Sequence, residues 1–163
     1  MSPAPIGIHP IISWELALWL GPIAKQSGGL ALAAPADLVL DDNSCVQPDR
    51  FYYRKERRPE IGPRFTLPPD LVIEILSPSH HARDRVTKAD LYAKHGVAEY
   101  WIVDPDERTF EFMVLVESPD RTGGKYQRQP LPTPPYTSPV CPEIQIDLPA
   151  FWVEIDRQLK PPE

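Results

Sequence analysis

The chain has 163 residues and a formal net charge of −6, and 42% of its residues are hydrophobic and 25% charged. These values are typical of one soluble globular domain over residues 1–163, and they exclude a disordered or fibrous chain. The negative net charge argues against a polycation that coats nucleic acid or acidic membranes without specificity. The two cysteines are too few for a disulfide scaffold or a cysteine-built zinc site, so we expect a reduced, cytoplasmic protein.

The first predicted element is an apolar helix over residues 11–24. No Lys or Arg precedes this run, Glu15 interrupts it, and it is shorter than the roughly 20 residues that a membrane span needs. We therefore expect a buried helix rather than a secretion signal or a membrane anchor. Gly28 and Gly29 end this helix, and Lys25 in its last turn suits the helix dipole.

Proline and turn residues divide the rest of the chain into short elements. We expect strands over residues 30–34, 37–40, 45–53, 71–76 and 99–103, and a hairpin partner over 108–117. A helix that ends near His95, before Gly96, separates the fourth and fifth strands, and a last helix covers residues 149–158. Prolines are so dense over residues 130–142 that this segment is predicted to be an extended surface loop.

Glu74 is the most informative single residue. It lies in the middle of the apolar run LVIEIL, in a strand that is predicted to be covered on both faces. A carboxylate in such a place must be paired, metal-bound or protonated, because an unpaired buried charge is unfavourable. A functional site and a structural ion pair with an arginine are the two alternatives.

Asp49 is the candidate partner of Glu74. Alternation along the predicted strand 45–53 places Gln47, Asp49 and Phe51 on one face. If the strands of Asp49 and Glu74 are neighbours, about 4.8 Å apart, one cation can reach both carboxylates. Ligation by a few oxygen atoms suits Mg²⁺ or Mn²⁺.

Four segments together resemble the Uma-two family of restriction endonucleases, which belongs to the PD-(D/E)XK nuclease superfamily. They are VQPD at residues 46–49, PPDLVIEILSPS at 68–79, the predicted helix with Asp84, Lys88 and Tyr92, and GVAEYWIVDP at 96–105. The resemblance extends over residues 8–116. It implies a restriction-endonuclease-like α/β fold with a central mixed β-sheet flanked by helices. It also implies a metal-dependent endonuclease that hydrolyses phosphodiester bonds, with DNA as the expected partner.

The resemblance assigns roles to three residues. Asp49 matches the metal-binding Asp of the family, and Glu74 matches the acidic ligand on the next strand. The superfamily Lys is expected two residues after this Glu, where the chain has Leu76, and in similar proteins the following helix supplies it at the position of Lys88. An ammonium there can orient the attacking water and offset charge on phosphorus. By spacing alone, Lys88 would be a surface residue paired with Asp84.

Further candidates surround these three residues. The supporting candidates are Gln47, Asp70, Tyr92 and Glu15, and His9 matches a His that opens the first helix in similar proteins. The segment 50–64 carries six basic and two acidic residues, and so has a charge of +4 against −10 for the rest of the chain. Its members Arg50, Arg54, Lys55, Arg57 and Arg58 are candidate phosphate-binding residues, with a solvated loop as the alternative.

Two departures from the family pattern, Leu76 in place of the expected Lys and the start of the chain, leave other functions open. Similar proteins carry an N-terminal hairpin with a Glu-Leu-x-x-Gly-Glu pattern, which is expected to be missing here because Met1 lies almost at the start of the matched stretch. A catalytically silent nuclease fold that binds nucleic acid or protein is therefore an alternative. A glycoside hydrolase that uses Asp49 and Glu74 as acid and base is another, although it gives Lys88 no role. A homodimer is the candidate oligomeric state.

Overall fold

The computed structural model describes residues 7–77, 83–117, 124–131 and 133–160, without the side chains of residues 83–85. The helices are α1 (Ile8–Ser27), α2 (Arg83–Lys94), α3 (Leu148–Leu159) and the short 3₁₀ helix η1 (Lys55–Glu60). The strands are β1 (Leu30–Ala33), β2 (Leu38–Asp41), β3 (Ser44–Val46), β4 (Arg50–Tyr53), β5 (Leu71–Ile75), β6 (Glu99–Asp104), β7 (Thr109–Glu117), β8 (Gly124–Arg128), β9 (Tyr136–Thr137) and β10 (Gln145–Ile146).

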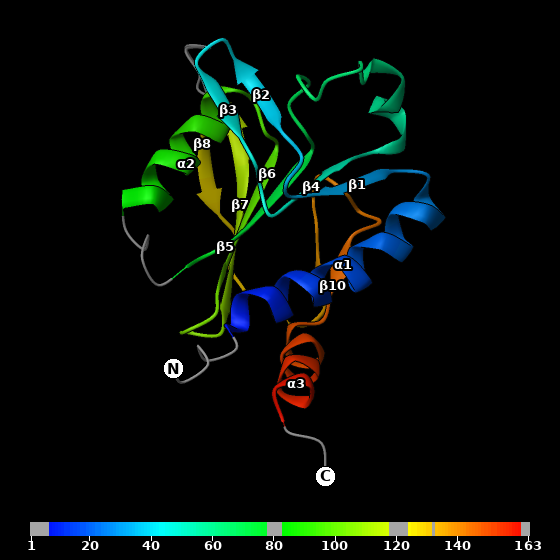
Figure 1. The fold of residues 1–163 in the computed structure, drawn as a ribbon, viewed down its shortest axis with the longest axis vertical. Helices are drawn as coiled ribbons and strands as arrows, with labels where there is room; N and C mark the ends of the chain where they lie inside the picture. The colour runs from blue at the N-terminus through cyan, green and yellow to red at the C-terminus, as the bar shows by residue number, and fades with distance from the viewer. Residues whose placement is uncertain (1–6, 78–82, 118–123, 132, 161–163) are drawn as a thin grey trace, which may run out of the picture.

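A six-stranded mixed sheet in the order β1-β4-β5-β6-β7-β8 forms the centre of the molecule (Figure 1). Strands β5 and β6 run parallel and are joined through α2, whereas the other neighbours in this sheet are antiparallel. Helices α1 and α3 cover one face and α2 covers the other. The predicted α/β fold with a central mixed sheet and flanking helices is confirmed.

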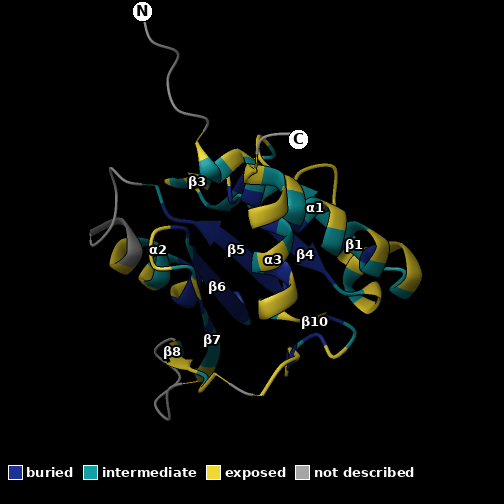
Figure 2. Ribbon diagram, turned by 90° about the horizontal axis from the view of Figure 1, so that it is seen from below, coloured by how far each residue is buried: buried dark blue, intermediate teal, exposed yellow. Residues whose placement is uncertain are grey.

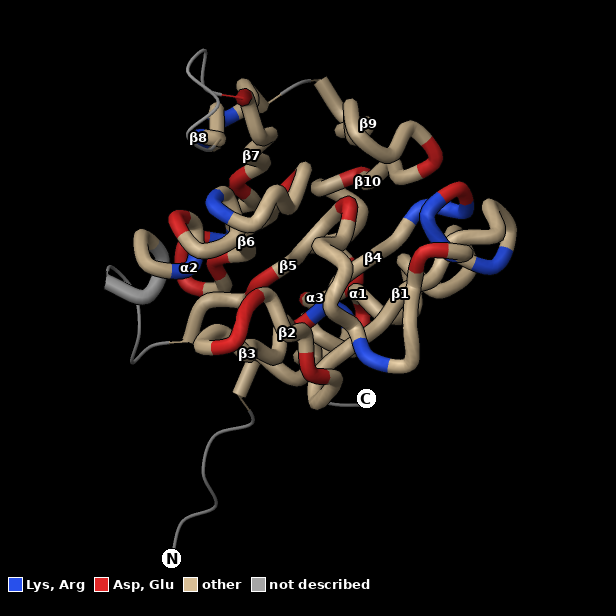
Figure 3. The backbone as a smooth tube through the Cα atoms, turned by 90° about the horizontal axis from the view of Figure 1, so that it is seen from above, with Lys and Arg blue, Asp and Glu red and all other residues tan. Residues whose placement is uncertain are grey.

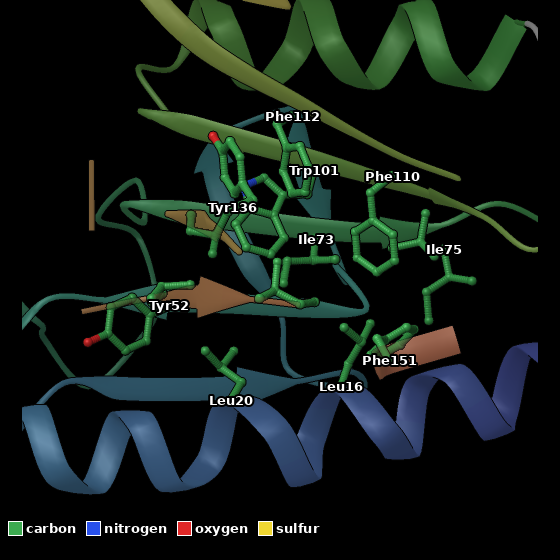
Figure 4. Packing of buried hydrophobic residues seen from close by; sticks show 14 of the residues in the cluster. Leu16, Leu20, Tyr52, Ile73, Ile75, Trp101, Phe110, Phe112, Tyr136 and Phe151 are labelled. Atoms are coloured by element: carbon green, nitrogen blue, oxygen red, sulfur yellow. The ribbon is translucent and has the colours of Figure 1, made fainter. Parts of the chain in front are cut away.

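The core follows from the alternation of side chains along β5, all of whose residues are buried. Leu71, Ile73 and Ile75 belong to the cluster that packs against α1 and α3. Figure 4 shows Leu16 and Leu20 of α1 directed toward this cluster. Val72 belongs to the second cluster, on the α2 side, and β5 is dark blue in Figure 2 because it is covered on both faces. Glu74 alternates with these residues and faces α2.

Helix α1 begins and ends near the predicted positions. Its buried residues recur every fourth position, at Ile12, Leu16, Leu20 and Ala24. Gly28 ends it with a φ of 78°, the left-handed conformation that glycine adopts without strain. Within the part of the chain that the structure describes, no helix is both long and apolar enough to pass through a bilayer.

Two local predictions are wrong. The single strand expected over residues 45–53 is split into β3 and β4, because Pro48 has no N–H to donate and residues 47–49 leave the sheet. The segment 130–142 is not simply a surface loop. Its Tyr136, Ser138 and Cys141 are buried, and Tyr136 stacks on Phe112 at a ring separation of 3.6 Å.

Candidate active site

The carboxylate of Glu74 is held between two side chains of α2. The side chain of Glu74 is only 6% exposed. Tyr92 donates its hydroxyl proton to Oε1 at 2.6 Å, and Nζ of Lys88 lies 3.1 Å from Oε2. Lys88 and Tyr92 are four residues apart on α2, so they share the helix face that looks onto β5. The prediction that Lys88 lies on the sheet-facing side of its helix is confirmed, whereas the side chain of Asp84 lies outside the described residues.

Asp49 lies beside Glu74 at the end of the sheet. Arg50 of β4 pairs with Ile73 of β5 in antiparallel register, and extending this register by one residue places Asp49 opposite Glu74. Oδ2 of Asp49 accepts the backbone N–H of Ile75 at 2.8 Å. The two predicted carboxylates are therefore brought together, although Asp49 lies just before β4 rather than inside a continuous strand.

His9 in the first turn of α1 approaches the same carboxylate. Its Nε2 lies 3.6 Å from Oδ1 of Asp49, and the His9 side chain is 37% exposed. This distance is longer than a hydrogen bond, so the contact is electrostatic. The contact with Asp49 is the main reason why the pKa of His9 is raised above its usual 6.5, and Glu74 adds a smaller contribution.

Burial and neighbouring charges shift the pKa values of the two carboxyl groups in opposite directions. Burial raises the pKa of Glu74 above its usual value, the charge of Asp49 adds to the increase, and Lys88 and Tyr92 oppose it. For Asp49, burial also acts to raise the pKa, but His9, the Ile75 amide and Lys88 outweigh burial and lower it. Two carboxyl groups with opposite pKa shifts, next to an ammonium, are typical of a functional site.

The donor set fits a hard divalent cation. Asp49 and Glu74 offer adjacent carboxylate oxygens, and Mg²⁺ or Mn²⁺ is commonly held by one or two carboxylates with water in the remaining positions. Glu74 has its pKa raised partly by the charge of Asp49, and a bound cation would relieve that repulsion. Among the described residues, no group of three or more His, Cys, Asp or Glu side chains is placed to hold a metal ion. The two carboxylates would therefore leave most of the coordination to water and substrate.

Three of the four supporting candidates lie elsewhere. Gln47 donates to Asp37 at 2.8 Å, because residues 47–49 are not in a strand and do not alternate as predicted. Glu15 accepts from Gln158 of α3 at 2.7 Å. Asp70 precedes β5 at the end opposite to Glu74, about 13 Å away for four extended residues. Tyr92 is the one supporting candidate that contacts a predicted catalytic residue.

The basic segment is also remote from the carboxylates. Residue Arg54 follows β4 at the end opposite to Asp49, about 16 Å away for five extended residues. Figure 3 shows the basic residues of η1 beside β1 and β4, on the opposite side of the molecule from α2.

Four of the five arginines of this segment contact other groups of the protein. Arg57 pairs with Asp70 at 3.3 Å, and Arg58 donates to the carbonyl of Gly28 at 3.2 Å. Arg54 lies 3.9 Å from both Glu56 and Glu143. Arg50 is only 8% exposed, and its guanidinium donates to the carbonyls of Ser13 and Asp49. The guanidinium of Arg50 is therefore not on a surface that could bind phosphate. The aliphatic part of the Lys55 side chain lies beside Gly28.

Sequence reasoning missed one of the two groups that fix Asp49. The Ile75 amide has no signature in the sequence, because any residue supplies a backbone N–H. His9 was a candidate only through the family resemblance, and its contact with Asp49 joins residues 40 positions apart.

Comparison with known proteins shows what the chain is similar to in sequence and in fold. The Uma2 family model, described as "Putative restriction endonuclease", matches residues 1–150. Among solved structures, the chain is similar to a "putative nuclease belonging to DUF820" from Anabaena variabilis ATCC 29413, with 24% identity and a TM-score of 0.66. The match covers 94% of this chain and 84% of that chain, and at this identity it is evidence for the fold alone. No curated protein matches.

Proposed function

Because this chain belongs to the Uma2 (Uma-two) family of putative restriction endonucleases, we propose that it is a metal-dependent endonuclease that hydrolyses phosphodiester bonds of DNA. Asp49, Glu74 and Lys88 form its catalytic centre in this proposal. The cation is Mg²⁺ or Mn²⁺.

One observation carries the proposal. A glutamate in the middle of a buried strand has an ammonium at 3.1 Å on one oxygen and lies opposite a second carboxylate in the sheet register. A purely structural ion pair would need only Lys88 and would be weakened by Asp49, whose negative charge raises the pKa of Glu74. Two carboxylates can hold a divalent cation, and a neighbouring lysine can stabilise the negative charge that develops on a phosphate during hydrolysis.

The protein's own groups prepare the site for a phosphate. The Ile75 amide and His9 hold Asp49, and Tyr92 holds Glu74, so that both carboxylates keep fixed orientations toward the cation. When bound there, the metal supplies an activated water and polarises the phosphate. Lys88 is 31% exposed, so its ammonium can leave Glu74 for the phosphate and stabilise the negative charge that develops on its oxygens. Its long stem keeps the ammonium mobile while the helix position stays fixed.

A plasmid-nicking assay with Mg²⁺ and with Mn²⁺ tests the proposal. We expect Asp49→Ala and Glu74→Ala to abolish cleavage. Lys88→Ala is expected to reduce single-turnover cleavage by about 10²-fold, the effect of losing one electrostatic contact in the transition state. The matched control is Lys94→Ala, because Lys94 lies on the same helix, is 72% exposed and contacts Asp41 instead of Glu74.

Binding measurements distinguish loss of catalysis from loss of the cation. Calorimetric titration with Mn²⁺ should show weaker binding for Asp49→Ala and unchanged or tighter binding for Lys88→Ala, because Lys88 competes for Glu74. If the wild-type protein cleaves neither DNA nor RNA with either metal, the catalytically silent binding protein becomes the better description. If Lys88→Ala and Lys94→Ala cleave equally well, Lys88 is not the catalytic cation.

A further inference from the structure

Arg50 is a buried arginine directly after the candidate metal ligand Asp49. It is the first residue of β4 and lies opposite Ile73 of β5, whose side chain belongs to the cluster that packs against α1 and α3. Residues that lie directly opposite each other in a sheet point to the same face, so the side chain of Arg50 extends toward α1. Only 8% of Arg50 is exposed. Its guanidinium is therefore enclosed between the sheet and α1.

The guanidinium of Arg50 connects Asp49 to α1. Nη1 donates to the backbone carbonyl of Asp49 at 2.6 Å, and Nη2 donates to the backbone carbonyl of Ser13 in α1. Ser13 lies four residues after His9, so the two share one face of the helix. His9 contacts the carboxylate of the same aspartate, with Nε2 3.6 Å from Oδ1. Helix α1 is thus joined to Asp49 twice, at the main chain through Arg50 and at the side chain through His9.

The two carbonyls that Arg50 contacts also have backbone donors. The carbonyl of Asp49 accepts the N–H of Ala34 at 3.4 Å. Ser13 lies inside α1, where its carbonyl accepts the N–H of the residue four positions further on. The hydrogen bonds of Arg50 are therefore not required to satisfy unpaired backbone groups. Their effect is to join two segments of the chain.

An arginine is an unfavourable residue for this buried position. A buried charge is normally paired with an opposite charge, and buried N–H groups are normally hydrogen-bonded. Among the described residues, Arg50 forms no ion pair, and its Nε is buried without a hydrogen-bond partner. Tyr52, two positions further along the same face of β4, contributes to the apolar cluster instead. Stability alone therefore does not account for an arginine at position 50.

We propose that Arg50 is a positioning residue, which ties the backbone of Asp49 to α1 and so keeps the Asp49 carboxylate opposite Glu74. Residues 47–49 lie outside the strands, so the sheet itself does not fix the main chain of Asp49. The Ile75 amide and His9 hold the two carboxylate oxygens, whereas Arg50 holds the main chain from which this side chain starts. Groups that orient a metal ligand without contacting the metal commonly change metal affinity by about 10–100-fold. The inference rests on the proposed function for the divalent cation, and on the contacts of Arg50 for the position of Asp49.

Calorimetric titration with Mn²⁺ is the first test. We expect Arg50→Met to weaken Mn²⁺ binding by about 10–100-fold. Arg50→Lys should give an intermediate affinity, because a single ammonium replaces the fork of two donor nitrogens. The matched control is Arg108→Met, because Arg108 also donates to a helix carbonyl, that of Trp152 at 3.2 Å, but in α3 instead of α1. Urea unfolding with EDTA should show that Arg50→Met remains folded, with a midpoint close to that of the wild type or above it.

Amide hydrogen exchange in the metal-free protein reports the position of Asp49 directly. The N–H of Ile75 donates to Oδ2 of Asp49, whereas the next N–H, of Leu76, donates to the carbonyl of Val103 at 2.9 Å. We expect Arg50→Met to accelerate exchange at Ile75 by about tenfold or more and to leave exchange at Leu76 unchanged. A general loosening of the fold would accelerate exchange at both amides.

The outcomes separate this inference from the proposed function. If the wild type binds Mn²⁺ and Arg50→Met binds it equally well, the inference is overturned, as it is if exchange at Ile75 is unchanged. Equal acceleration at Ile75 and Leu76, with a lower urea midpoint, would also overturn it, because Arg50 would then act on the whole fold. If the wild type binds no Mn²⁺ but Arg50→Met accelerates exchange selectively at Ile75, Arg50 positions Asp49 and the proposed metal-dependent function is the part that fails.

Discussion

Replacing Lys88 by methionine removes the ammonium from Glu74 and keeps most of the apolar stem. In the metal-free protein, the hydrogen bond from Tyr92 at 2.6 Å would then be the one contact with a polar side chain that Glu74 keeps among the described residues. Removing one partner of a fully buried ion pair costs about 3–5 kcal/mol, and a hydrogen bond to a charged group contributes about 1.5–3 kcal/mol. Lys88 is 31% exposed, so we expect a loss of about 2 kcal/mol in the free energy of unfolding.

The loss in the free energy of unfolding caused by Lys88→Met should increase as the pH rises. Below pH 4.5, the usual pKa of a glutamate, Glu74 is protonated in both the folded and the unfolded chain, so the ammonium of Lys88 contributes little. Above that value the unfolded chain releases its proton while folded Glu74, with its raised pKa, retains it, and stability falls as the pH rises. Lys88→Met raises the pKa of Glu74 in the folded protein further. The difference in the free energy of unfolding between wild type and variant should therefore grow with pH until the pH exceeds this higher pKa.

Urea unfolding with EDTA, at pH 4.5 and in mildly alkaline buffer, measures this difference. In a Glu74→Gln background, Lys88→Met should cost less at alkaline pH than in the wild-type background, because the carboxylate nearest to the ammonium is gone and the more distant Asp49 remains. Lys94→Met, on the exposed side of the same helix, should change stability by less than about 0.5 kcal/mol. A loss of equal size at both pH values would refute the reasoning, since it would show that the loss does not come from the charge on Glu74.

Three further predictions concern the scaffold. Gly29→Ala should destabilise the protein by about 2–3 kcal/mol in urea unfolding, because a Cβ there would lie 2.1 Å from the hydroxyl of buried Tyr52. His9→Gln should lower the melting temperature in buffers just below pH 6.5, and this deficit should shrink as the pH rises through the raised pKa of His9; a deficit that is constant with pH would contradict the electrostatic contact. Glu99→Ala should reduce the free energy of unfolding by more than about 3 kcal/mol, because it leaves three buried donors without an acceptor, and Glu111→Ala on the neighbouring strand β7 serves as the control.

Glu74 could be singled out from the sequence because its signal is local, whereas the roles of Asp49 and Lys88 were expected from the family resemblance. A glutamate inside a short run of branched apolar residues must be buried and must have partners, and the structure gives Glu74 the partners Lys88 and Tyr92. The four-residue spacing of Lys88 and Tyr92 fixes their common face on α2 once the helix is assigned. Gly28 and Gly96, with φ values of 78° and 79°, mark the ends of their helices for the same local reason.

Contacts between distant segments could not be predicted. Glu99 accepts hydrogen bonds from Trp101, from Tyr136 and from Ser138, and the last two lie 37 and 39 residues further along the chain. In the sequence, Glu99 is only the polar first residue of an apolar strand, and Tyr136 and Ser138 stand among prolines that indicate a surface loop. Their burial depends on β9 pairing with β10 and packing on the sheet, which no local pattern shows.

The basic segment 50–64 shows most clearly how a charge count along the sequence differs from charge in space. Its formal charge of +4 suggested a phosphate-binding loop next to Asp49. In the fold, β4 carries the segment to the far end of the sheet, and acids from other parts of the chain, Asp70 and Glu143, neutralise two of its arginines. Arg54 is only five residues from Asp49 in the sequence, but an extended strand turns five residues into about 16 Å. Lys88, which is 39 residues from Asp49, is instead the cation that reaches the carboxylates, because the parallel connection through α2 folds the chain back over β5.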